Sequence, residues 1–312
     1  MKKTVRIVAG VACALALSCT MLAGCASTSG SSSASASASA SVSADQKAAD
    51  EVADLIDKIY VQQRTETTDA DCAAAKAAWD KLTPAQQELV EGENADPDYF
   101  GRDTGDATKD DPRNQDNIGD KEILVVSFGT SFNNSRVNDI KGIEDAIATA
   151  NPDWSVRRAF TAQIIINHIQ ARDGEAIDNM DQALARAEKN GVKQLVVQPT
   201  HLMHGAEYDE MMEALKPYES KMQISVAEPM LGPVGATVTE TNDDKVAAAT
   251  AVVDAAVAAS KYASTDAAAA EKTAFVFLGH GTSHAAAITY SQMYNTFQDL
   301  NLPNVFVGTV EG

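Results

Sequence analysis

The chain has 312 residues and carries 44 acidic against 25 basic side chains, a formal net charge of −19. Because so acidic a chain repels phosphate backbones, a nucleic-acid partner is excluded, whereas a small or metal-containing ligand is not. Hydrophobic residues make up 45% of the sequence, enough to bury a core, so a wholly disordered chain is excluded too.

The first residues, 1–25, predict a lipoprotein signal peptide. Lys2 and Lys3 precede an apolar stretch that ends in Leu22-Ala23-Gly24-Cys25. This ending resembles the bacterial lipobox, in which the signal is cleaved before a cysteine that becomes lipidated. An ordinary cleaved signal with a chance cysteine is the alternative. We expect an exported protein, extracellular or periplasmic, that a lipid on Cys25 anchors to the outer face of the cytoplasmic membrane.

Three segments follow this signal. Residues 26–44 contain almost only Ser and Ala and predict a flexible tether. Residues 45–90 place apolar side chains at helical spacing and predict a small helical segment. Residues 91–120 hold ten acidic and three basic side chains and predict a solvated acidic linker, because the spacing of a calcium-binding loop is absent.

From residue 121 onward, strand patterns alternate with helix patterns. The predicted strands cover 123–128, 154–160, 195–198, 223–227, 274–278 and 305–310. The predicted helices cover 135–150, 161–171, 178–190, 206–216, 242–260 and 285–299. Such alternation implies right-handed crossovers and a parallel sheet with helices on both faces. The predicted fold class is α/β.

Ligands of open α/β sheets bind beyond the carboxyl ends of the strands. The first predicted strand ends in Ser127-Phe128-Gly129-Thr130-Ser131, a turn that suits an anion or is purely structural. After the third strand, His201 and His204 predict either metal ligation or a turn in which one histidine orients a neighbour. The sequence contains no phosphate-binding P-loop and no G-x-G-x-x-G motif.

The fifth predicted strand leads to His280, which lies between Gly279 and Gly281 and is followed by His284. The flanking glycines remove side-chain bulk, so a large flat substrate can approach the imidazole. Because histidine titrates near neutral pH and binds borderline metals, His280 is a candidate proton acceptor and metal ligand. Glu311, after the last strand, either lies beside His280 or is an ordinary exposed glutamate.

Together these motifs resemble the anaerobic, sirohydrochlorin-type cobalt chelatases, a branch of the class II tetrapyrrole chelatases. The matching pieces are Leu124–Ser131, Arg158–Thr161, Arg172–Gly174, His201 with Gly205-x-Glu207-Tyr208, Gly279-His280-Gly281-x-x-His284, and Val310-Glu311. The resemblance implies two similar α/β halves that face a tetrapyrrole cleft. The first half covers residues 121–264, and residues 272–312 form the start of the second half. It also implies a further metal-binding histidine later in the second half. Because the chain stops at Gly312, we expect a truncated second half.

The resemblance implies a specific activity, the insertion of Co²⁺ into sirohydrochlorin with loss of two pyrrole protons, as in anaerobic cobalamin biosynthesis, without a nucleotide. His280 would be the catalytic proton acceptor and a metal ligand, and Glu311 a second metal ligand. The candidate substrate-binding residues are Ser127, Thr130, His201, His204 and His284. Three arginines are either candidates for pairing with carboxylates of the substrate or ordinary solvated surface charges: Arg157, Arg158 and Arg172.

Two alternatives stay open at this point. One is a non-catalytic surface lipoprotein that binds haem, another tetrapyrrole or a metal. The other is a chelatase for Ni²⁺ or Fe²⁺. The sequence does not decide whether the chain forms a homo-oligomer.

The lipoprotein hypothesis is tested by Cys25→Ser. We expect the variant to leave the membrane fraction or to remain unprocessed, because the lipid-bearing thiol is gone. Cell fractionation and gel mobility measure the two effects. Unchanged membrane association together with unchanged mobility would contradict the hypothesis.

Overall fold

The computed structural model describes residues 32–100 and 104–311, with side chains described from residue 44 onward. The predicted signal 1–25, Cys25 included, and residues 26–31 of the predicted tether lie outside the described residues. The chain divides into a unit that ends at Ala44 and a compact unit that begins at Asp45. Among the described helices, none is both long and apolar enough to cross a membrane.

The N-terminal helices are α1 (Ser32–Ile59), α2 (Thr68–Trp79) and the short α3 (Pro84–Gln87). Residues 32–44, expected to be flexible, belong to α1, and their many alanines favour a helix. From residue 45 onward α1 buries apolar side chains in one hydrophobic cluster with α2. Helix α2 in turn packs on helix α6 (Gln163–Asp173). Asn167 of α6 donates a hydrogen bond to the backbone oxygen of Ile59 at 2.8 Å. The helical segment therefore packs on the α/β part of the chain.

The acidic stretch 91–120 differs from the solvated linker that its composition predicts. Tyr99 and Phe100 are buried, and the side chain of Asp110 has no exposed area. The physical reason is that Arg136 and Arg158 are themselves buried, and buried guanidinium groups need carboxylate partners. Composition alone could not reveal this, because the partners lie far away in the sequence.

Sheet A has four parallel strands in the order β2-β1-β3-β4. Their bounds are β1 (Lys121–Ser127), β2 (Ser155–Phe160), β3 (Gln194–Pro199) and β4 (Gln223–Val226). Val125 of β1 lies opposite Arg158 of β2 and Gln198 of β3. The predicted α/β class and these predicted strands are confirmed, with each end within two residues of its expected place.

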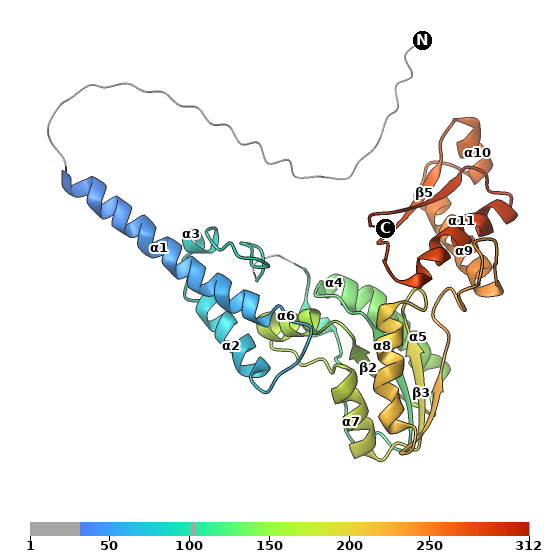
Figure 1. Ribbon diagram of the computed structural model, residues 1–312, viewed down its shortest axis with the longest axis horizontal. Coiled ribbons are helices and arrows are strands. Elements are labelled where there is room, and N and C mark those ends of the chain that lie inside the picture. The colour runs from blue at the N-terminus through green and yellow to red at the C-terminus, as the bar shows by residue number, and fades with distance from the viewer. Residues whose placement is uncertain (1–31, 101–103, 312) are drawn as a thin grey trace, which may run out of the picture. The chain divides into compact units, whose positions relative to one another are not determined.

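Helices cover both faces of sheet A (Figure 1). Leu124 and Val126 face α7 (Met180–Asn190) and α8 (Ala206–Leu215), whereas Ile123 and Val125 face α5 (Lys141–Ala150). Before α5, the chain forms α4 (Asn133–Ser135) and the π-helical turn η2 (Arg136–Ile140). Every crossover returns the chain to the amino end of the sheet, so the strand-end turns gather at the carboxyl edge.

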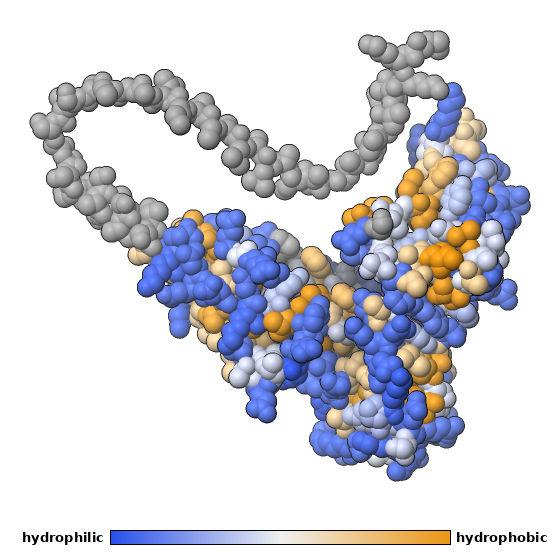
Figure 2. All heavy atoms as spheres, viewed as in Figure 1, coloured by the Kyte–Doolittle hydropathy of each residue, from blue (hydrophilic) through white to orange (hydrophobic). Residues whose placement is uncertain are grey.

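The C-terminal elements are α9 (Asp243–Ala259), α10 (Thr265–Ala270), β5 (Phe275–Gly279), α11 (Ile288–Asp299) and β6 (Val305–Thr309). Strands β5 and β6 form a parallel two-stranded sheet, one face of which packs on α9 and α11. On the other face, Val276 and Leu278 are 64% and 68% exposed. Figure 2 shows hydrophobic residues on the visible surface of this part of the chain. Helix α10 was not predicted, because its alanine-rich sequence has no apolar periodicity.

His168 of α6 has a packing role between the N-terminal segment and sheet A. Its Nε2 lies 2.8 Å from the backbone oxygen of Tyr99, and its ring stacks on that of Tyr99 at 4.2 Å. Burial lowers the pKa of His168 to about 4, from an ordinary value of 6.5. The folded protein therefore keeps this imidazole neutral at mildly acidic pH.

This pKa predicts an acid-sensitive contribution to stability. Below pH 6.5 the unfolded chain takes up a proton that the folded chain accepts only near pH 4, so acid favours unfolding across that window. Relative to His168→Gln, the wild type should lose about 2–3 kcal/mol more unfolding free energy between about pH 7 and about pH 4.5. Urea titrations at both pH values measure the difference, and equal losses in the two proteins would contradict the prediction.

Candidate functional site

The carboxyl ends of β5 and β6 bring His280 and Glu311 together. The strands pair in parallel as far as Gly279 and Thr309, and the pairing continues beyond them. The backbone nitrogen of Glu311 donates to the backbone oxygen of His280 at 2.8 Å. Both residues are exposed. The two side chains with the most suitable chemistry thus emerge from adjacent positions at the edge where ligands of such sheets bind.

The two glycines beside His280 allow a close crossing of chains. Gly281 has a φ of +93°, and a Cβ there would overlap the backbone oxygen of Glu311. A Cβ at Gly279 would overlap the ring of Tyr290, whose hydroxyl accepts a hydrogen bond from the backbone nitrogen of Gly281 at 3.1 Å. The sequence predicted that these glycines leave space for a substrate. In the structure, the space at Gly281 is taken by the backbone of Glu311, and the space at Gly279 is taken by the ring of Tyr290.

The tautomer of His280 follows from its neighbour. Its Nδ1 lies 3.2 Å from the backbone oxygen of Gly281. A carbonyl oxygen only accepts, so in the neutral ring Nδ1 carries the hydrogen and Nε2 carries the lone pair. His280 therefore offers Nε2 as its basic, metal-binding atom.

The turn after β1 repeats the geometry of the turn after β5. The backbone nitrogen of Ala162 donates to the backbone oxygen of Phe128 at 3.2 Å, as Glu311 does to His280. Gly129 has a φ of +102°, close to that of Gly281, and Thr-Ser follows in both turns. Phe128 and Ala162 thus occupy the positions of His280 and Glu311. The equivalent turn in the first half is apolar at both positions.

Ser127 and Thr130 lie in this first turn but are engaged within the protein. Ser127 is buried, and its Oγ accepts a hydrogen bond from Thr200 at 2.8 Å. The hydroxyl of Thr130 accepts from the backbone nitrogen of Phe132 at 3.2 Å. Both residues hold the turn in shape, and Thr130 is the more accessible of the two.

The histidines after β3 and β5 other than His280 do not gather into one cluster. His204 Nε2 lies 2.6 Å from Glu228, and His284 Nε2 lies 3.3 Å from Asp209. Both ring nitrogens of His201 are buried without a hydrogen-bond partner, and burial lowers the pKa of His201. In the described parts of the chain, no three His, Cys, Asp or Glu side chains come together in a group that could hold a metal.

Glu228 and Asp209 were missed by the sequence reasoning. They reach their histidines from the loop after β4 and from α8, respectively, so no local spacing connects the two members of either pair. The sole sequence signal is their placement near predicted carboxyl strand ends, where acidic residues are not otherwise distinctive.

The expectation that Arg157 and Arg158 pair with substrate carboxylates is wrong. Neither has any exposed area, because both are bound to carboxylates of the protein. Arg157 pairs with Glu122 at 2.7 Å, and Arg158 pairs with Glu144 at 2.8 Å. Arg172 is also largely buried, and it donates to Ser131 and Asp173.

The crossing at Gly281 predicts a large effect of Gly281→Ala on stability. Gly174 is a matched control, since its φ is also positive, +69°, while a Cβ there meets nothing. Gly174→Ala should cost about 1 kcal/mol for left-handed strain alone. Gly281→Ala should cost about 2–4 kcal/mol, because the backbone of Glu311 must also move. Thermal unfolding measures both, and equal costs would contradict the crossing.

Comparison with known proteins places this site in a family. The family model described as "Cobalt chelatase (CbiK)" matches residues 121–312. Sirohydrochlorin cobaltochelatase of Salmonella typhimurium is 30% identical over 194 residues, which cover 61% of this chain and 66% of that protein. Sirohydrochlorin cobaltochelatase CbiKC of Nitratidesulfovibrio vulgaris is 26% identical over 195 residues, 62% of each chain. The chain thus spans somewhat less than two thirds of the length of these relatives. The chain belongs to the cobalt chelatase (CbiK) family.

Proposed function

We propose that the chain is a sirohydrochlorin cobaltochelatase, which inserts Co²⁺ into sirohydrochlorin with loss of two pyrrole protons. The observation that carries the proposal is the adjacency of His280 and Glu311 at the carboxyl edge of β5 and β6. The printed names of the two relatives support the choice of metal and macrocycle.

The chemistry needs groups that can exchange a metal for a proton. As Co²⁺ enters the ring, four nitrogens replace its earlier ligands and two N–H protons leave. The lone pair on Nε2 of His280 holds either Co²⁺ or a proton, but not both at once. Each ligand that releases the metal is therefore free to accept a proton. One imidazole and one carboxylate match the two protons that must go.

The surroundings favour contact with the face of a macrocycle over ion pairing with its carboxylates. The large apolar side chains exposed at the carboxyl ends of β1, β3 and β4 are Phe128, Phe132, Leu202 and Met230. Arg157, Arg158 and Arg172 are already paired with acidic residues of the protein. The carboxyl ends of the strands are acidic, and this charge attracts a divalent cation. The acidic residues there are Glu207, Asp209, Glu228 and Glu311. We infer that metal capture is electrostatic and that ring binding is largely apolar.

Location and metal choice belong to the proposal as well. The lipobox-like Leu22–Cys25 supports an exported chelatase with a lipid anchor in the membrane. The alternatives are a chelatase for Ni²⁺ or Fe²⁺ and a surface lipoprotein that binds haem, another tetrapyrrole or a metal without catalysis. Imidazole and carboxylate accept all three metal ions, so the ligand types do not separate them.

The decisive experiment mixes the purified chain with sirohydrochlorin and excess Co²⁺ and follows the change of the absorption spectrum. Repeated turnover supports the chelatase, whereas a change that stops at one macrocycle per chain supports the binding protein. Parallel reactions with Ni²⁺ and Fe²⁺ establish the metal preference. A rate no higher than that of the protein-free mixture would contradict the proposed activity.

We expect His280→Ala to reduce insertion by about 10²-fold or more, because a proton acceptor and a metal ligand are lost together. Sirohydrochlorin binding should be largely retained. Glu311→Gln keeps the shape and removes the charge, so it should raise the Co²⁺ concentration needed for half-maximal rate more than that of the macrocycle. His168→Gln is the control for loss of an imidazole, because the His168 ring stacks on Tyr99 and its Nε2 is engaged by the Tyr99 backbone oxygen. Near-normal insertion by His280→Ala would refute the assignment and make His201 or His204 the next candidate.

A further inference from the structure

Part of the segment that precedes the family-matched region lies against α4, which directly follows the turn 128–132. The backbone oxygen of Thr104 accepts a hydrogen bond from the backbone nitrogen of Asn134 at 2.7 Å, and Thr104 is buried. The family model begins at residue 121, so this contact is made from outside the matched region. Residues 104–113 therefore contact the helix that follows the turn 128–132, the counterpart of the turn that holds His280.

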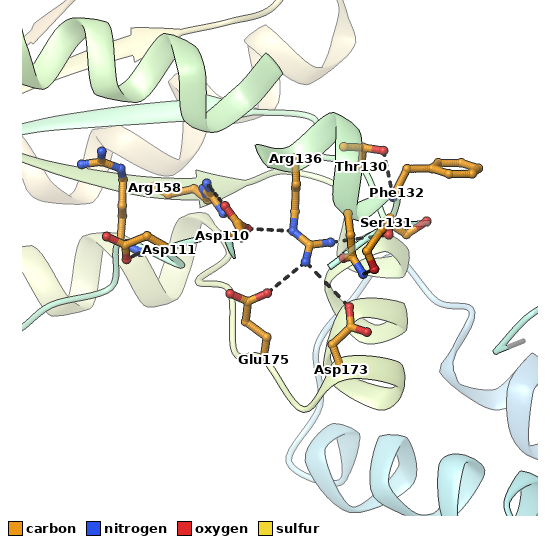
Figure 3. A network of polar contacts seen from close by, with 12 residues as sticks. Asp110, Asp111, Thr130, Ser131, Phe132, Arg136, Arg158, Asp173 and Glu175 are labelled. Atoms are coloured by element: carbon orange, nitrogen blue, oxygen red, sulfur yellow. Dashed lines mark hydrogen bonds and ion pairs between the residues drawn. The ribbon is translucent and has the colours of Figure 1, made fainter. Parts of the chain in front are cut away.

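The strongest link from this segment is Asp110, which lies between two buried arginines (Figure 3). Its Oδ2 is 2.8 Å from Nε of Arg136 and 2.7 Å from Nη1 of Arg158, and its Oδ1 is 2.9 Å from Nη2 of Arg158. Burial would raise the pKa of this carboxyl, but the hydrogen bonds and charges of Arg158 and Arg136 hold the pKa below its usual range. Asp110 is therefore ionised at neutral pH.

Arg136 connects Asp110 to the turn. Its backbone nitrogen donates to the backbone oxygen of Phe132 at 2.9 Å, and its Nη1 lies 3.5 Å from the backbone oxygen of Ser131. Arg172 donates to the same oxygen of Ser131 at 2.6 Å. The backbone that carries Phe128, Thr130 and Phe132 is thus held by guanidinium groups, one of which takes its orientation from Asp110.

We propose that Asp110 is a positioning residue for the turn 128–132, so that a segment outside the family-matched region sets the affinity of the site for the macrocycle. This inference rests on the proposed function, because the turn is assigned to macrocycle binding. Asp110 touches no substrate and acts through Arg136.

Removal of the Asp110 charge leaves both arginines paired. Arg136 keeps Glu175 at 3.0 Å and Asp173 at 3.7 Å, as Figure 3 shows. Arg158 keeps Glu144 through two hydrogen bonds of 2.8 Å. The variant Asp110→Asn therefore preserves the size of the side chain and strands no buried charge. The substitution weakens only the ion pairs by which Asp110 connects residues 104–113 to Arg136 and Arg158.

Asp116→Asn is the matched control. Asp116 belongs to the same acidic stretch and also binds two cations, Arg186 at 2.9 Å and Lys189 at 3.0 Å. It precedes β1 and therefore lies toward the amino edge of sheet A, away from the strand-end turns. Both substitutions remove one negative charge, so their effects on net charge cancel in the comparison.

The test is steady-state insertion of Co²⁺ into sirohydrochlorin by the full chain and both variants. Asp110→Asn should raise KM for sirohydrochlorin roughly tenfold, with kcat and KM for Co²⁺ close to wild type, because a loosened turn weakens ring binding before chemistry. Asp116→Asn should leave all three constants unchanged. A fall in kcat at unchanged KM, or equal effects of both variants, would overturn the proposal.

A second measurement does not depend on activity. Backbone hydrogen exchange at residues 129–136 should be faster in Asp110→Asn than in wild type and Asp116→Asn, whereas exchange in β1 and β3 should not change. If the wild type inserts no metal, the proposed function fails, while this exchange pattern still decides whether Asp110 holds the turn. Unchanged exchange at 129–136 would overturn the positioning role even in an active enzyme.

Discussion

The site depends on a close passage of two backbones, that of Gly281 and that of Glu311. A Cβ at Gly281 would occupy the place of the backbone oxygen of Glu311, and the φ of +93° suits glycine. This passage lets the pairing of β5 and β6 continue past the strands, so that the backbones of His280 and Glu311 are hydrogen-bonded to each other. A proton acceptor and a carboxylate are thereby placed at neighbouring backbone positions by main-chain hydrogen bonds.

The equivalence of the two turns suggests how one geometry serves two purposes. In the turn after β5, the paired positions hold His280 and Glu311, which suit metal and proton. In the turn after β1, they hold Phe128 and Ala162, and Phe128 is 45% exposed. An aromatic face is suited to a flat ring and contributes no charge that would compete for the metal. On the proposed function, the first turn binds the macrocycle and the second performs the exchange.

Much of the fold could be predicted from local patterns. The strands of sheet A, together with β5 and β6, follow from short apolar runs, and the ends of α6 and α7 coincide with Gly174 and Gly191 at positive φ. The strand-end rule also led to the turns that hold His280 and Phe128, before any spatial information. Helix α10 was not predicted, because a run of alanines shows no periodicity that would indicate which face is buried.

What could not be predicted is long-range pairing of charge. Arg157 and Arg158 are adjacent in β2, so they point to opposite faces of the sheet, and neither looks different from a solvated arginine in the sequence. Their partners Glu122, Glu144 and Asp110 come from β1, from α5 and from the irregular segment before β1. The same limit applies to the pairs His204–Glu228 and His284–Asp209, whose members lie far apart in the sequence.

The buried arginines also explain how residues 104–113 are held against the family-matched region. Arg157 finds both of its carboxylates, Glu122 and Asp178, inside the family-matched region. Arg158 finds Glu144 there but shares its remaining hydrogen-bonding capacity with Asp110, from outside. A buried ion pair contributes little net stability, whereas the loss of one partner costs about 3–5 kcal/mol if the other charge is left alone. Because Glu144 already pairs with Arg158, the bond to Asp110 is not needed to keep that buried charge paired. Asp110 also binds Arg136, and Arg136 contacts the turn that carries Phe128, so the role proposed for Asp110 is to hold that turn from residues 104–113.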